Sequence, residues 1–127
     1  MKHLLATAGA ILALGTAAPA VAQGMPAPPP SETTTITGTV VDLSCKFTHN
    51  LTGDGHRMCA QVCADQGVPL VILGSDGQVY LPVGEGMPSA GQNARLRDFA
   101  EQQVRITGQV FAAGDSKVIL ITNVRRA

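Results

Sequence analysis

The chain has 127 residues, of which 45% are hydrophobic and 14% charged, and its nine basic side chains balance nine acidic ones. This length is that of one small domain. The balanced charge provides no basic surface for a polyanion, and only 3% of residues are aromatic. Because single strands are bound by basic grooves with aromatic platforms, the composition disfavours a nucleic-acid partner.

The first 22 residues have the layout of a bacterial-type secretory signal peptide. Lys2 gives a basic start, residues 4–14 form a mostly apolar run, and residues 20–22 (Ala-Val-Ala) form a small-x-small cleavage site. The apolar run is shorter than the roughly 20 residues that span a bilayer. We therefore expect a periplasmic or secreted protein with no stable membrane insertion after cleavage.

Residues 23–35 are rich in proline, serine and threonine, so we expect an extended tether. The remaining residues, 36–127, contain alternating apolar runs and turn residues that predict one β-rich domain. The expected strands are 36–43, 69–73, 78–83, 104–112 and 117–124, and the expected helices are 56–66 and 93–102, with a loop at 44–55. Gly67 is expected to end the first helix.

Five strands with a helix between the third and fourth is the order of an OB-fold barrel. The predicted fold is therefore mainly β, a small OB-fold-like five-stranded barrel. It carries a Cys/His helix inserted after the first strand and a second helix between strands three and four.

The chain resembles small exported bacterial OB-fold-like proteins. These proteins carry a Thr-Gly-x-Val-Val-Asp strand, a Cys…His-x-x-Cys-x-x-x-Cys segment and a Gly-x-Pro strand. The matching positions are residues 37–42, Cys45, His56, Cys59, Cys63 and residues 67–70. Such proteins have no established function, so the resemblance implies the architecture and no activity.

The Cys/His segment suggests a metal site. On the predicted helix, His56, Cys59 and Cys63 share one face within an arc of about 60°, and Cys45 would arrive from the end of the first strand. Three thiolates and an imidazole suit Zn²⁺ in a closed tetrahedral site, or Cu⁺, which prefers soft ligands. The sequence therefore predicts an exported Cu(I)- or Zn(II)-binding protein that is not an enzyme. His49 and Met58 are possible auxiliary ligands.

Two alternatives stay open at this stage. Cys45 could form a disulfide with Cys59 or Cys63, giving a metal-free domain that binds an envelope protein. A Cys59–Cys63 pair is disfavoured, because helical residues four apart have Cβ atoms about 5–6 Å apart and a disulfide needs about 3.5–4.5 Å. In the third hypothesis the thiols cycle between redox states and His56 lowers a thiol pKa.

Overall fold

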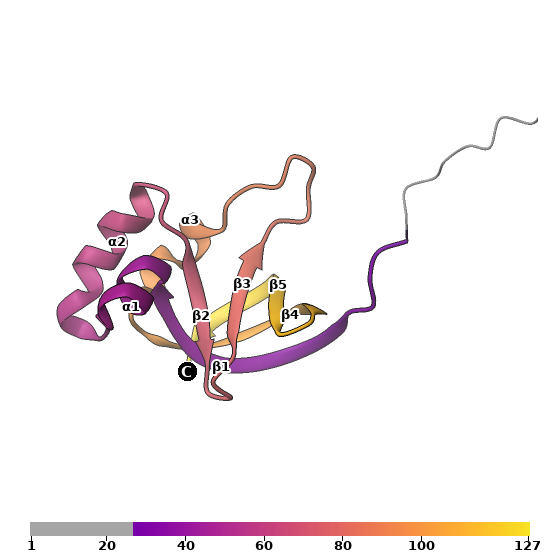
Figure 1. Cartoon of the computed structure of the whole chain (residues 1–127), viewed down its shortest axis with the longest axis horizontal. Helices are drawn as coiled ribbons and strands as arrows, with labels where there is room; N and C mark the ends of the chain where they lie inside the picture. Colours follow the sequence, from indigo (N-terminus) through magenta and orange to yellow (C-terminus); the bar gives the residue numbers. More distant parts are fainter. Residues whose placement is uncertain (1–26) are drawn as a thin grey trace, which may run out of the picture.

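The computed structural model describes residues 27–127, and these form a closed five-stranded barrel (Figure 1). The predicted signal peptide and the start of the tether lie outside the described residues. The strands are β1 (Glu32–Asp42), β2 (Leu70–Gly74), β3 (Val79–Val83), β4 (Gln103–Ala113) and β5 (Ser116–Arg126). Their order around the barrel is β1-β2-β3-β5-β4, with β3 parallel to β5 and the other pairs antiparallel. The predicted OB-fold-like class is confirmed.

The first strand closes the barrel by pairing on both sides. β1 begins at Glu32, earlier than predicted, and residues 32–35, which the sequence placed in the tether, pair with β4. Gly38 stands where the two pairings overlap, opposite Gly74 on β2 and Val104 on β4. A Cβ atom on Gly38 would lie 2.6 Å from the carbonyl oxygen of Leu73. Glycine therefore permits the close crossing at which the barrel closes.

The barrel interior is filled by alternating side chains of the strands and by residues of two helices. Its buried members are Val40, Ala64, Leu70, Ile72, Tyr80, Leu96, Val104, Ile106, Ile119 and Ile121. Ala64 and Leu96 come from the helical segments on either side of the β2–β3 hairpin. These helical segments are therefore part of the hydrophobic core, which fixes their position on the barrel.

Two helices, not one, lie between β1 and β2, and they stand beside each other at one end of the molecule (Figure 1). They are α1 (Leu43–His49) and α2 (Arg57–Asp65), with a 3₁₀ turn, η1 (Asp54–His56), leading into α2. The prediction of a loop over 44–55 was therefore wrong for its first half. The local reason is Asp42, whose side chain caps the start of α1.

The second predicted helix is present but shorter than expected. It consists of α3 (Asn93–Leu96) followed by a 3₁₀ turn, η2 (Arg97–Phe99). It ends because Ala100 is extended and bridges to Val40, and because Glu101 has a φ of 58°. The predicted end of α2 is confirmed at Gly67, whose φ is 95°. Within residues 27–127 no helix is long and apolar enough to cross a membrane.

Candidate metal centre

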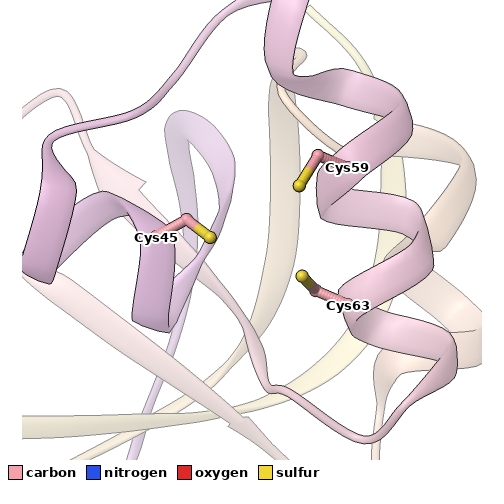
Figure 2. A group of neighbouring side chains, drawn as sticks. All are labelled: Cys45, Cys59 and Cys63. Carbon is pink, nitrogen blue, oxygen red and sulfur yellow. The ribbon is translucent and has the colours of Figure 1, made fainter.

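Cys45 lies on α1, which begins immediately after the first strand. Oδ1 of Asp42 accepts a hydrogen bond of 2.7 Å from the backbone N–H of Cys45, and this contact starts the helix. The helix ends at Asn50, which has left-handed backbone geometry and donates its N–H to the carbonyl of Cys45. Cys45 is thus held by the helix at both its backbone N–H and its carbonyl. The Cys45 side chain points toward α2 (Figure 2).

Cys59 and Cys63 lie one helical turn apart on α2. The buried residues of this helix are Ala60 and Ala64, and these small side chains let it lie close to the barrel. Each cysteine directly precedes one of these alanines, so the two thiols form a neighbouring stripe. The stripe faces α1, and all three sulfur atoms point into the space between the two helices (Figure 2).

The three Sγ atoms all lie within 4.8 Å of one another, and all three cysteines are free thiols. A Zn–S bond of about 2.3 Å places the sulfurs about 3.8 Å apart in a tetrahedral site and about 4 Å apart in a trigonal one. Binding an ion therefore requires the sulfurs to approach by about 1 Å or less. The donor set and its spacing fit a soft metal ion.

His56 has a different principal contact from the one the sequence suggested. It is not among the ligand atoms that lie within 4.8 Å of one another. Its ring is 7% exposed, and Nδ1 lies 3.1 Å from Oε1 of Glu101. Because a carboxylate only accepts, Nδ1 carries the proton in this contact. Nε2 is buried and has no hydrogen-bond partner within residues 27–127.

The other two candidate ligands lie on the surface. His49 is exposed at the end of α1, where a basic side chain suits the helix terminus. Met58 is 77% exposed. Its position on α2 lies about 100° from that of Cys59, so the helix itself turns Met58 away from the thiol stripe.

Glu101 holds the segment that leads into α2, and the sequence did not reveal this role. Its Oε2 accepts hydrogen bonds of 2.8 Å from both Thr52 Oγ1 and the backbone N–H of Gly53. Its own backbone N–H donates to the carbonyl of Val40 at 2.8 Å. One buried carboxylate therefore fixes the α1–α2 connection and His56 to the barrel. No short-range pattern identifies it, because its partners lie 45 to 49 residues away.

Two further contacts fix the remainder of α2. The side-chain amide of Asn93 donates to the carbonyls of Ala64 and Val68, and its Oδ1 accepts from the N–H of Leu70. Arg97 forms a two-bond ion pair with Asp65, at 2.6 and 2.8 Å. The sequence predicts Asn93 only as the first residue of a helix. Together these contacts tie α2 to the segment between β3 and β4.

The thiols lie in a negative environment. Hydrogen bonding to Asp42 is the main cause that raises the pKa of Cys63 from 9.0 to about 12, with desolvation and the charge of Asp42 acting in the same direction. Desolvation and the Asp42 charge also raise the pKa of Cys45. Both thiols are therefore protonated near neutral pH. For these two thiols, the shift is opposite to the lowered thiol pKa that the redox hypothesis requires.

Apolar side chains are exposed on both helices of the site. They are Phe47 on α1, Leu51 just after it, and Met58 and Val62 on α2. The surface around the cysteines therefore exposes more apolar side chains than are usual on helices that face only solvent.

No family model, curated protein or solved structure matched this chain. The chemistry of the site therefore rests on its own residues.

Proposed function

We propose that this protein is an exported binding protein for a soft metal ion, Cu(I) or Zn(II). The observation that carries the proposal is the convergence of three cysteine sulfurs, within 4.8 Å of one another, from two helices. Thiolate is the ligand that both ions favour. The export signal in residues 1–22 supports a periplasmic or secreted location.

The scaffold supports binding rather than a loose cluster of thiols. Asp42 and Asn50 hold the two ends of α1, while Glu101, Asn93 and Arg97 tie α2 to the barrel. The three thiols are therefore brought together before an ion arrives, which lowers the ordering cost of binding. Because two of the thiols are protonated at neutral pH, metal binding must release their protons.

The test measures bound metal and free thiols on one sample of the exported chain. Metal is quantified by mass spectrometry, and thiols are alkylated with and without a chelator. We expect one ion per chain and three thiols that become reactive only when the metal is removed. One reactive thiol, a disulfide from Cys45 and no metal after adding Zn²⁺ or Cu⁺ would overturn the proposal.

A second candidate function is a metal-free domain that binds an envelope protein. The exposed apolar side chains of Phe47, Leu51, Met58 and Val62 favour it, since such side chains gather at protein-binding surfaces. The same measurement separates the two functions. This candidate requires Cys45 to be oxidised with Cys59 or Cys63 in the exported protein, leaving no thiolate set to hold an ion.

A further inference from the structure

The ligand group of the centre consists of sulfur alone. The Sγ atoms of Cys45, Cys59 and Cys63 lie within 4.8 Å of one another and point into the space between α1 and α2 (Figure 2). Within residues 27–127, no ligand atom of a histidine, aspartate or glutamate lies within 4.8 Å of all three sulfurs. The fold therefore offers an ion three soft donors and no hard one. The number of ligands, as well as their softness, then decides which ion the centre suits.

Each candidate for a fourth protein ligand lies outside this group. The ring of His56 is held by Glu101 through Nδ1 at 3.1 Å. Nε2 of His56 and Oδ2 of Asp42 are buried without a hydrogen-bond partner within residues 27–127, yet neither atom belongs to the sulfur group. His49 is exposed at the end of α1, and Met58 is 77% exposed and turned away from the thiols. The arrangement therefore supplies three protein ligands.

The spacing of the sulfurs suits a planar, three-coordinate ion. With metal–sulfur bonds of about 2.3 Å, three sulfurs lie about 4 Å apart in a trigonal site and about 3.8 Å apart in a tetrahedral one. Cys59 and Cys63 are attached one turn apart on the same helix, where Cβ atoms are about 5–6 Å apart. The trigonal site therefore needs the smaller approach from separations of up to 4.8 Å.

We propose that the centre is a three-coordinate, all-sulfur site and that its ion is Cu⁺ rather than Zn²⁺. This inference rests on the proposed metal-binding function and selects between its two ions. Cu⁺ prefers soft thiolate ligands, and three of them in a plane complete its coordination. Zn²⁺ in protein sites takes four ligands. At this centre Zn²⁺ has to take its fourth ligand from solvent, which reaches the site because Cys59 is exposed.

X-ray absorption of the exported chain, loaded without oxygen with Cu⁺ or with Zn²⁺, tests the coordination directly. We expect three sulfur neighbours and no nitrogen or oxygen around Cu⁺. Around Zn²⁺ we expect three sulfurs and one oxygen, and added imidazole should replace that oxygen. A nitrogen or oxygen neighbour of Cu⁺ would overturn the proposal. So would a fourth neighbour of Zn²⁺ that shows imidazole scattering before imidazole is added, or one that added imidazole does not replace.

Competition between the ions provides a second readout. One equivalent of Cu⁺ added to the Zn²⁺-loaded chain should release all of the bound Zn²⁺, and retention of Zn²⁺ would contradict the proposal. If the unmodified chain binds neither ion, the proposed function itself fails. If it binds Zn²⁺ in preference to Cu⁺, metal binding stands and only the three-coordinate Cu⁺ assignment is overturned.

Substitutions distinguish the three sulfurs from the two buried candidates. His56→Gln and Asp42→Asn should each change the Cu⁺ affinity by less than about threefold, whereas Cys59→Ser should lower it about 100-fold or more. Asparagine caps a helix as well as aspartate does, so Asp42→Asn keeps the start of α1. A loss in either variant equal to that in Cys59→Ser would add a fourth protein ligand and overturn the three-coordinate site.

Discussion

Nδ1 of His56 lies 3.1 Å from Oε1 of Glu101, and the side chain of Glu101 is completely buried. The contact joins the start of α2 to the turn before β4, across 45 residues of sequence. A histidine that spacing alone assigns to a metal site is thus held on its other ring nitrogen by a carboxylate of the barrel. Substitutions at Glu101 and at His56 therefore distinguish a structural role of this histidine from a ligand role.

Glu101→Gln should destabilise the domain by about 2 kcal/mol or more, because an amide nitrogen would replace one of the acceptor oxygens that Thr52, Gly53 and His56 share. Urea unfolding of the metal-free chain measures the change. Glu85→Gln, in the exposed loop after β3, is the matched control and should lie within about 0.5 kcal/mol of the original. Equal stability of the two variants would show that the buried network contributes little.

Replacing any one of Cys45, Cys59 and Cys63 by serine should lower the Zn²⁺ affinity by at least about 100-fold. Substituting a residue that only contacts a metal ligand already lowers metal affinity about 10- to 100-fold. His56→Gln should lower stability but change affinity by less than about threefold, because its main contact is Glu101. Chelator competition provides the affinities. A loss at His56 equal to that at the cysteines would restore the Cys₃His set.

The stability of the metal-free chain should fall with alkaline pH. The folded state raises the pKa of Cys63 from 9.0 to about 12, so it favours the protonated thiol. The contribution of this shift to the free energy of unfolding is fully present below about pH 9, where the Cys63 thiol is protonated in the unfolded chain too. It is lost as the pH rises toward about 12. Urea midpoints under reducing conditions check it.

Cys63→Ser is the control for this pH effect, because Tyr80 also has its pKa raised to about 12 and would titrate in both proteins. The decline in the free energy of unfolding between about pH 9 and about pH 12 should be smaller in Cys63→Ser than in the original chain. Parallel pH profiles would mean that Asp42 does not hold the Cys63 proton in the folded state.

Asn93→Ala should destabilise the domain by about 2–3 kcal/mol, because it leaves the carbonyls of Ala64 and Val68 and the N–H of Leu70 without their partner. Thermal or urea unfolding measures the loss. Asn123→Ala, at an exposed position of β5, makes the same substitution and should be nearly neutral. A small effect at Asn93 would mean that the end of α2 is held mainly by packing.

The barrel was predictable because its signals are local. Apolar strands separated by turn residues indicated five strands in the right order, although β1 began earlier than expected and α1 was missed. Gly67 correctly marked the end of α2, where Val68 donates to Cys63 and Gly67 to Ala64. The sequence places Asp42 in the first strand, where it does lie, but the neighbouring residues do not reveal that its side chain also caps the helix that follows.

The sequence by itself determined that Cys59 and Cys63 share a helical face, because four residues make about one turn. Only the tertiary structure decided which other groups meet them. Barrel closure brings α1 beside α2 and so places Cys45 opposite the pair, while it buries Asp42 at the start of α1 and sets Glu101 against His56. Helical periodicity is a property of consecutive residues. Contacts between residues more than 40 positions apart depend on strand register and chain reversal, which no short segment contains.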